Sequence, residues 1–369
     1  DHLITFLKYN QVDLVVVGPE APLVTGLADV FNKAGIPVFG PSKAAAQLEG
    51  SKVFAKDLMK KYNIPTAAYG VFHKVDEAKE FIGQTGAPIV VKADGLAAGK
   101  GVVVAMTIEE ANAAVEDMLR GNRFGDAGST VVIEEFMEGE EASLLAFVDG
   151  KTVVPMIASQ DHKRIFDGDK GPNTGGMGTY APAPVLTDAL RDEAMKTILE
   201  PMVAAMEKEG MPYVGCLYAG LMITPQGPKV VEFNARFGDP ETQVVLPLLD
   251  SDLGQIMMAC ATGTLTADMV KWKDSSAACV ILASKGYPET SSKGDVIHGD
   301  IKQHDTTIVF HSGTKLIGDE YVTNGGRVLG VVGLGKDLRT ALDRAYGRIE
   351  HIDFEGMQYR TDIGAKAFK

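Results

Sequence analysis

Two short apolar segments near the beginning of the chain constrain its fold more than any other feature. Residues Asp13–Val17 and Pro37–Phe39 each lead into a Gly-Pro pair, and a helical stretch separates them. Nearly continuous apolar strands that alternate with helices are typical of a parallel sheet covered on both faces. Two strands alone make a poor sheet. We therefore expect residues 1–50 to be the remnant of a parallel, Rossmann-like α/β domain whose first strands lie outside this sequence.

The size, charge and cysteine content narrow the class of protein. A chain of 369 residues is too long for one hydrophobic core, so we expect several domains. The net charge of −13 argues against a general nucleic-acid binder, which needs a basic face. No apolar run reaches the roughly 18 residues of a membrane span. Three scattered cysteines are too few for a disulfide framework and favour a reducing, cytoplasmic compartment.

Later segments predict a multidomain protein of mixed α/β and α+β type. Apolar strands and helices with regular spacing continue to about residue 264. From Leu265 the composition changes to short β segments with glycine turns, which end in a helix near Leu338–Ile349. We therefore predict a small, mostly-β C-terminal domain at residues 265–369.

A glycine-rich loop, Asp94–Gly101, is the first candidate site. Glycines allow backbone N–H groups to approach a phosphate closely. The loop is no P-loop, because its spacing is one residue short and no Ser or Thr follows Lys100. Lys92, on the apolar strand before the loop, would place a cation over the same phosphates. The alternatives are a structural turn and a surface lysine with its stem along apolar surface.

The predicted strand Val230–Arg236 is the second candidate. Side chains alternate along a strand, so Glu232, Asn234 and Arg236 would share one face. Carboxylate and amide oxygens suit Mg²⁺, and a neighbouring guanidinium suits a phosphate or acyl phosphate. The alternative is a solvated polar face. The residues between are apolar and would face the core: Val231, Phe233 and Ala235.

The acidic segment Glu134–Glu141 is the third candidate. It follows a predicted strand, Val131–Glu135, and could bind a nucleoside through its backbone and through a carboxylate to the ribose. A solvated acidic turn is the commoner origin of such a run of charge.

The long polar segment Ser159–Pro184 is the fourth candidate. It has almost no apolar periodicity, so we expect a loop, and loops of that length are usually functional or disordered. The cations of Gln160–Arg164 and the glycines of Gly171–Gly178 have the composition of a flexible substrate-binding lid. A disordered surface loop is the alternative. No Ser/His/Asp or Cys/His nucleophile pattern stands out elsewhere.

These segments together resemble the ATP-grasp ligases, and among them the glycinamide ribonucleotide synthetase family. The segments that carry the resemblance are spread over the chain: Gly18–Leu23, Gln47–Lys52, Lys92–Gly101, Ser159–Arg164, Pro172–Gly178, Glu232–Glu241, Gly294–Gly299 and Thr323–Leu329. The resemblance implies an ATP-grasp domain at residues 51–264, with a small lid subdomain at about 66–137. The family begins with a strand and a Gly-Gly-Arg-Glu-His loop that this sequence does not contain.

The resemblance implies a reaction of three substrates. ATP would phosphorylate glycine to glycyl phosphate, and the amine of 5-phosphoribosylamine would attack it to give glycinamide ribonucleotide, ADP and phosphate in purine biosynthesis. The implied cofactors are ATP and Mg²⁺ or Mn²⁺, and we expect a monomer that binds neither nucleic acid nor membranes. The alternatives are another ATP-grasp carboxylate–amine ligase and a nucleotide-binding module with little turnover.

The resemblance also implies residue roles. Arg236 and Lys92 would be catalytic, and Glu232 and Asn234 would bind the metal ion. The implied nucleotide-binding residues are Lys52, Lys92, Gly95, Gly99, Lys100, Gly101, Glu134, Glu135, Phe136, Met137, Glu141 and Asn234. The implied residues for glycine and phosphoribosylamine are Glu20, Asp161, Lys163, Arg164, Gly175, Gly176, Gly178 and Arg236.

Overall fold

A computed structural model describes residues 1–97, 100–121 and 124–369 of the chain. Close contacts group these residues into two units. Unit 1 consists of three stretches: Asp1–Met156, Asp188–Phe237 and Asp252–Val270. Unit 2 consists of the other three: Ile157–Thr187, Gly238–Ser251 and Lys271–Lys369.

Unit 1 begins with a small parallel α/β layer. Strands β1 and β2 pair in parallel, with Val15 opposite Val38, and the core beside them includes Leu23 and Phe31 from two helices. This confirms the parallel α/β arrangement that the sequence predicts. The elements of the layer are α1 (His2–Tyr9), β1 (Val15–Val16), α2 (Glu20–Val24), α3 (Leu27–Lys33) and β2 (Val38–Phe39).

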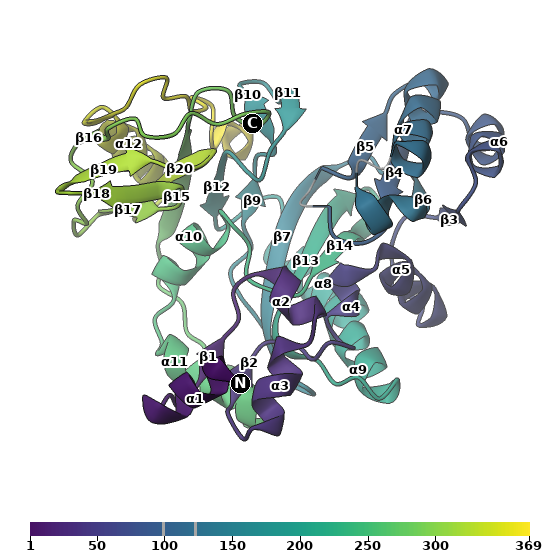
Figure 1. The fold of residues 1–369 in the computed structure, drawn as a ribbon, viewed down its shortest axis with the longest axis horizontal. Coiled ribbons are helices and arrows are strands. Elements are labelled where there is room, and N and C mark those ends of the chain that lie inside the picture. The colour runs from purple at the N-terminus through teal and green to yellow at the C-terminus, as the bar shows by residue number, and fades with distance from the viewer. Residues whose placement is uncertain (98–99, 122–123) are drawn as a thin grey trace. The chain divides into compact units, whose positions relative to one another are not determined.

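A four-stranded antiparallel sheet of unit 1, the small sheet, carries the glycine-rich loop. Its strand order is β3–β6–β4–β5, and helices α6 and α7 cover one face (Figure 1). Ile89 and Val91 pack under these helices, so Lys92 lies on the opposite face. Its elements are β3 (Tyr69–Phe72), α6 (Val75–Thr85), β4 (Ile89–Ala93), β5 (Val102–Ala105), α7 (Ile108–Arg120) and β6 (Val131–Glu135).

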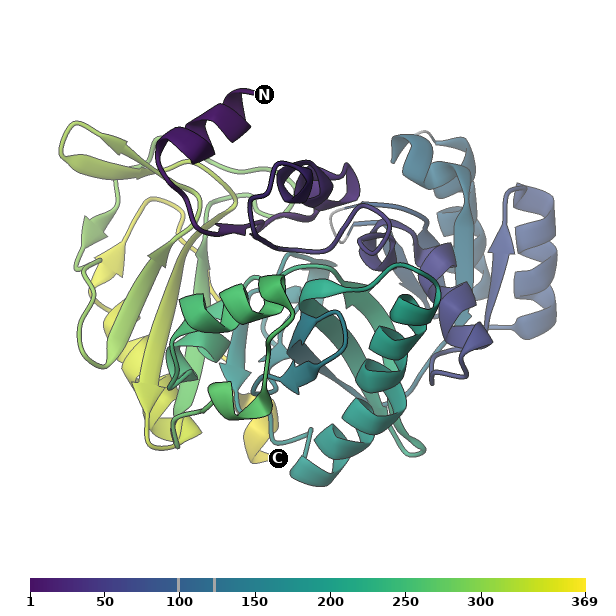
Figure 2. The ribbon, with the colours of Figure 1, turned by 90° about the horizontal axis from the view of Figure 1, so that it is seen from below.

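A second antiparallel sheet of unit 1, the large sheet, has the order β14–β13–β7–β8. Helices α8 and α11 pack against it (Figure 2). A π-helical turn, Met195–Leu199, separates α8 from α9, and Pro201 follows in the first turn of α9, where proline is tolerated. The elements are α4 (Gln47–Gly50), α5 (Lys52–Lys61), β7 (Glu140–Asp149), β8 (Val153–Pro155), α8 (Asp188–Ala194), α9 (Glu200–Lys208), β13 (Val214–Thr224), β14 (Gly227–Asn234) and α11 (Leu253–Thr262).

Unit 2 is mostly β, as the sequence predicts for the C-terminal region. Its five-stranded sheet has the order β17–β20–β15–β12–β9, and helix α12 packs on β15 and β20. Its elements are β9 (Gln160–Asp161), β10 (Arg164–Phe166), β11 (Lys170–Asn173), β12 (Gly178–Ala181), α10 (Thr242–Val245), β15 (Ser276–Ala283), β16 (His298–Gly299), β17 (Thr307–His311), β18 (Thr314–Ile317), β19 (Glu320–Thr323), β20 (Arg327–Gly335), α12 (Leu338–Ile349) and β21 (Ile352–Asp353).

The prediction of a long loop at Ser159–Pro184 is wrong. This segment contains strands β9 to β12, and β12 pairs on one side with β15 and on the other with β9. All four residues of β12 are buried. The sequence hides this strand because Gly178 and Thr179 are small or polar, so the segment shows no apolar alternation.

The remaining helical segments are 3₁₀ turns. They lie at Gly125–Ser129, Leu246–Leu248, Ala267–Met269 and Ala365–Phe368. Within the part of the chain that the structure describes, no helix is long and apolar enough to cross a membrane.

Candidate active site

Lys92 is buried on the face of the small sheet that the helices leave open. Its side chain is 5% exposed, which excludes the surface-lysine alternative. Its Nζ lies 3.0 Å from Oε2 of Glu134 and donates to the backbone oxygen of Val231, 3.1 Å away on β14. One ammonium group therefore links the small sheet to the strand that carries the predicted metal ligands.

Glu134 bridges two buried lysines. Its other carboxylate oxygen lies 3.3 Å from Nζ of Lys56, which also donates to Thr66 Oγ1 at 2.7 Å. Burial lowers the pKa of Lys56 to about 8, against the opposing effect of Glu134. The solvated-turn alternative is wrong for Glu134, which is 2% exposed. Glu135 and Glu141, farther along the same segment, are exposed.

The glycine-rich loop is attached to the start of helix α5. Oδ1 of Asp94 accepts the backbone N–H of Lys52 at 2.6 Å, and Nζ of Lys52 donates to the carbonyl of Gly95 at 2.8 Å. Burial, the largest effect, lowers the pKa of Lys52. A Cβ on Gly101 would lie 2.6 Å from that of Ala97, so the loop closes too tightly for a side chain there. The predicted Gly99 lies outside the described residues.

Strand β14 places two oxygen ligands next to each other on one side of the large sheet. Glu232 lies opposite Gly220, and Asn234 lies opposite Tyr218 on β13. Both are half-buried. They occupy alternate positions of a regular stretch of strand, so their side chains share a face.

Two details of the predicted strand are wrong. The register shifts between Gly220 and Leu221, so Val230 is the buried residue and Val231 is half-buried. A bulge of this kind interrupts the alternation and frees a carbonyl, here the one that Lys92 contacts. The strand also ends at Asn234, so Arg236 lies just beyond it.

Arg236 is held between two carboxylates. Its Nε lies 3.3 Å from Oε2 of Glu20, and its Nη2 lies 3.1 Å from Oε1 of Glu49. The other oxygen of Glu49 accepts the backbone N–H of Ala235 at 2.7 Å. Burial raises the pKa of Glu49 to about 7, although Arg236 opposes the shift. Sequence reasoning assigned no role to Glu49, although it lies in Gln47–Lys52, one of the segments that carry the family resemblance.

The other predicted substrate residues lie in unit 2. Nζ of Lys163 lies 3.0 Å from Oδ2 of Asp161. Gly176 has a φ of +123°, and a Cβ there would lie 2.9 Å from Oδ1 of Asp161, so this carboxylate lies against the glycine turn. Nη1 of Arg327 donates to the carbonyl of Gly175 at 3.0 Å. These contacts and the pairing of β12 with β15 hold the glycine run in this structure, and its predicted flexibility stays a prediction.

Gly178 serves packing in this structure. A Cβ there would lie 2.5 Å from Cδ1 of Ile363, and its carbonyl lies 3.1 Å from Nδ1 of His162. His162 is 1% exposed, and burial, the largest effect, lowers its pKa.

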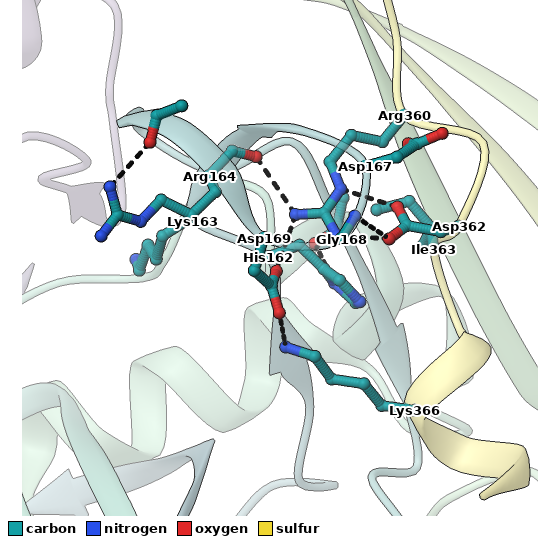
Figure 3. Close-up of polar contacts among 12 residues, drawn as sticks. His162, Lys163, Arg164, Asp167, Gly168, Asp169, Arg360, Asp362, Ile363 and Lys366 are labelled. Atoms are coloured by element: carbon teal, nitrogen blue, oxygen red, sulfur yellow. Dashed lines mark hydrogen bonds and ion pairs between the residues drawn. The ribbon is translucent and has the colours of Figure 1, made fainter.

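A second cluster in unit 2, which sequence reasoning missed, supports the segment with Lys163 and Arg164. Figure 3 shows the guanidinium of Arg360 between Asp362, Asp169 and the carbonyl of Arg164. Lys366 contacts Asp169 at 2.8 Å. Arg360 is 1% exposed. Asp362 is only two residues away in sequence, but Arg164 and Asp169 lie nearly 200 residues away, so no local pattern could have revealed the whole cluster.

Unit 1 thus combines a buried lysine and a glycine hairpin on one sheet with two oxygen ligands and an arginine at the end of a strand of another. Among the described residues, no group of three or more His, Cys, Asp or Glu side chains could hold a metal ion alone. A metal ion at such a site takes further ligands from phosphate and water. The fold and this site define an ATP-grasp enzyme, the class that the sequence resembles.

Comparisons with known proteins identify the family. The chain matches models of phosphoribosylglycinamide synthetase for its N domain at residues 1–49, its ATP-grasp (A) domain at 50–242 and its C domain at 277–366. It is 54% identical over 368 residues to a phosphoribosylamine–glycine ligase of Neisseria meningitidis serogroup A, covering 99% of this chain and 87% of the relative. A Caulobacter vibrioides ligase of the same name is 55% identical over 372 residues, covering 100% and 87%.

Solved structures agree. A crystal structure of phosphoribosylamine–glycine ligase from Thermotoga maritima has a TM-score of 0.81 and 38% identity, covering 89% of this chain and 82% of that one. A biotin carboxylase from Campylobacter jejuni shares the fold, with a TM-score of 0.78 at 15% identity over 97% and 78% of the two chains. This chain belongs to the phosphoribosylglycinamide synthetase family of ATP-dependent ligases.

Proposed function

We propose that this protein joins glycine to 5-phosphoribosylamine at the expense of ATP, in purine biosynthesis. The products are glycinamide ribonucleotide, ADP and phosphate. The observation that carries the proposal is the identity of 53 to 55% with phosphoribosylamine–glycine ligases over essentially the whole chain. Because a carboxylate is a poor acyl donor, the reaction needs a phosphorylation that supplies a leaving group.

The reaction proceeds in two steps. A carboxylate oxygen of glycine attacks the γ-phosphorus of ATP, and ADP leaves with the electron pair of the broken P–O bond. The amine nitrogen of phosphoribosylamine then attacks the carbonyl carbon of glycyl phosphate. Phosphate leaves with the C–O electron pair, and the nitrogen loses a proton. No protein nucleophile is needed, so the side chains act by positioning and by neutralising charge.

The nucleotide is assigned to the small sheet and its loop. Lys52 and Lys92 bind the phosphates together with backbone N–H groups of the loop. Lys92 is also a catalytic residue in this proposal. The backbone of Glu135, Phe136 and Met137 contacts the adenine, and Glu141 binds the ribose hydroxyls. The other proposed nucleotide contacts are Gly95, Gly99, Lys100 and Gly101. Glu134 acts through Lys92, because both of its carboxylate oxygens contact lysines.

The residues of β14 fit a divalent cation. Glu232 and Asn234 supply a carboxylate and an amide oxygen on one face, and the facing strand, Leu217–Ile223, contains no acidic residue. Mg²⁺ is commonly held in this way, with few protein ligands. We assign Mg²⁺ to these residues and Mn²⁺ as its substitute. When bound, the ion neutralises charge on the phosphate oxygens, while Arg236 holds the acyl phosphate.

The remaining substrate contacts are those that the resemblance to the family implies. We assign Glu20 beside Arg236 in unit 1 to the amine. We assign to glycine and phosphoribosylamine the unit 2 residues Asp161, Lys163, Arg164, Gly175, Gly176 and Gly178.

We also place the protein in the cytoplasm, where its three free, buried cysteines would stay reduced. We expect a monomer, which light scattering during size-exclusion chromatography would test.

The function is tested by ADP formation with glycine and phosphoribosylamine supplied together and with each withheld in turn. The proposal expects full turnover only with both, and glycinamide ribonucleotide as the product. ADP formation that needs a different carboxylic acid would identify another ligase of the same class. Nucleotide binding without any turnover would identify a binding module.

A further inference from the structure

Glu49 makes two polar contacts at the end of β14, although it lies far from that strand in sequence. One carboxylate oxygen contacts Nη2 of Arg236 at 3.1 Å, and the other accepts the N–H of Ala235 at 2.7 Å. Both partners lie 186 or more residues away in sequence. Glu49 therefore fixes a side chain and the adjacent backbone group together, where a single ion pair would fix only the side chain.

Its burial distinguishes Glu49 from the second carboxylate on the same guanidinium. The side chain of Glu49 is 8% exposed, whereas that of Glu20 is 30% exposed and makes one contact at 3.3 Å. Burying a carboxylate is costly, and the pKa of Glu49, raised to about 7, reflects that cost. A side chain that only stabilised the fold would not be expected to carry such a penalty, whereas functional sites often do.

Glu49 also lies on the segment that holds the glycine-rich loop. It lies in helix α4, two residues before Ser51, whose Oγ caps α5 by accepting the N–H of Phe54 at 3.1 Å. The next residue, Lys52, is bound through its N–H to Asp94. Residues 49–52 therefore connect the end of β14 with the base of the loop.

We propose that Glu49 is a positioning residue that holds the guanidinium of Arg236 and the end of strand β14 in the geometry needed for phosphoryl transfer. The proposal rests on the proposed function, in which Arg236 holds the transferring phosphoryl group. Glu49 touches neither substrate nor metal ion in this scheme. It acts by holding the guanidinium of Arg236 in one position, so that the side chain does not move to another anion. It also fixes the backbone N–H of Ala235, the residue that follows Asn234.

The test compares Glu49→Gln with Glu49→Asp and with a matched control, Glu209→Gln. The glutamine keeps an oxygen for the N–H of Ala235 but loses the charge that holds Arg236, and the aspartate keeps the charge on a shorter side chain. Glu209 also pairs with a lysine in unit 1, Lys61, but away from the candidate site. Steady-state ADP formation and the melting temperature are measured for each protein.

For Glu49→Gln we expect kcat to fall about 10- to 100-fold, as for a misplacement of about an ångström, while KM for MgATP changes less than about threefold. We expect its melting temperature at about pH 8 to stay the same or rise, because burial raises the pKa of Glu49, so its ionised form at this pH lowers the stability of the folded state. Glu49→Asp should recover part of the lost kcat, and Glu209→Gln should match the wild type. An unchanged kcat in Glu49→Gln, or a loss of kcat that follows a loss of folded protein in both variants, overturns the proposal.

Failure of the proposed function would be visible separately. It would show as a wild-type protein without glycine-dependent ADP formation. In that case crystal structures of the wild type and of Glu49→Gln decide the inference. A displaced Arg236 guanidinium in the variant supports a positioning role, and an unmoved one overturns it.

Discussion

At the scale of residues, the candidate site contains two groups of charged side chains. In each group one central side chain contacts two partners of opposite charge. Glu134 joins Lys56 to Lys92, and Arg236 joins Glu20 to Glu49. Each buried charge thus has a partner, which limits the cost of burial. Glu232, which is assigned to the metal ion, lies close enough to Lys52 to act on the pKa of that lysine, although burial has the larger effect and lowers it.

Replacing Glu232 by glutamine should weaken metal-dependent nucleotide binding without unfolding the protein. The amide keeps the shape of the side chain but is a poorer ligand for a hard cation. Calorimetric titration should show about tenfold weaker binding of ATP in the presence of Mg²⁺, with little change in the presence of EDTA. Glu207→Gln, which removes an exposed ion pair with Lys151, is the control. Loss of folding with unchanged affinity would show that Glu232 is structural.

Glu49 should make the stability of the protein fall as pH rises toward neutrality. Its pKa is about 7 in the folded state and ordinarily 4.5, so between these values the folded state binds the proton more strongly. The contribution of Glu49 to the free energy of unfolding should therefore decline by about 1 to 3 kcal/mol from about pH 5 to about pH 8, whereas His162, whose pKa burial lowers, acts in the opposite direction. Urea unfolding across this range measures the decline, which Glu49→Gln should remove. An equal decline in the variant would contradict the assignment to Glu49.

Other carboxylates do not obscure that window. Asp169 and Asp362 have pKa values below the ordinary 3.8, through hydrogen bonds to Arg360 and Lys366 that outweigh burial. Their contribution is complete above pH 3.8 and is lost only as pH falls further. The decline that Glu49 causes therefore lies at higher pH.

The sequence could predict those residues whose signal is local. Lys92 stands out because its strand is otherwise apolar, and Glu232 and Asn234 because they alternate with apolar neighbours. The contacts of Glu49 could not be predicted, since its partners are distant in sequence. Of the acidic partners of Arg360, Asp362 is local but Asp169 is distant, so the cluster could not be predicted either. The wrong placement of Val231 has another cause, because a bulge depends on the facing strand and leaves no mark in the residues of β14.

At the scale of elements, the small sheet and α5 are joined by the buried group Lys56–Glu134–Lys92. Lys56 comes from α5, Lys92 from β4 and Glu134 from β6. Lys92 extends the group to β14 through the carbonyl of Val231. Element positions were predicted well where strands are apolar, as for β4 and β6, and poorly for β9 to β12, whose short polar strands have no periodicity.

Replacing Lys56 by methionine should destabilise unit 1 strongly. The variant removes one of the two ion pairs of the buried Glu134 carboxylate and keeps the pair with Lys92, and breaking a buried ion pair costs about 3 to 5 kcal/mol. Urea unfolding followed by circular dichroism measures the loss. Lys61→Met, which removes an exposed pair with Glu209, should cost less than about 1 kcal/mol. Equal costs for the two variants would show that Glu134 is satisfied without Lys56.

Replacing Gly101 by alanine should impair the glycine-rich loop and leave the fold intact. A Cβ there would lie 2.6 Å from the Cβ of Ala97 and 3.2 Å from that of Ala93, so the loop must shift. We expect KM for ATP to rise about tenfold, because the phosphate-binding N–H groups lose their positions. Gly83→Ala is the control, since nothing lies within 4 Å of a Cβ in the middle of α6, and it should stabilise the helix by about 0.5 to 1 kcal/mol. A KM unchanged in Gly101→Ala would remove the loop from the nucleotide site.

At the scale of the whole molecule, the two units do not follow the order of the chain. Residues 157–187 belong to unit 2 because β12 pairs with β15, almost a hundred residues later, although unit 1 resumes at Asp188. The sequence predicts a β-rich C-terminal region but cannot reveal this exchange, because strand pairing between distant segments depends on the folded backbone. Each unit has hydrophobic clusters of its own, so each can respond separately to a ligand.

Nucleotide binding should therefore protect the two units unequally. All of the proposed nucleotide contacts, from Lys52 to Asn234, lie in unit 1. A ligand stabilises the part of a protein that must be folded to bind it, by an amount that grows with its concentration above Kd. Hydrogen exchange with and without MgATP should show slower exchange in β4 and β14 but little change in β15 and β20, whose amides open through unfolding of unit 2. Protection of β15 and β20 equal to that of β4 would mean that both units unfold together. The two units would then not be independent in stability.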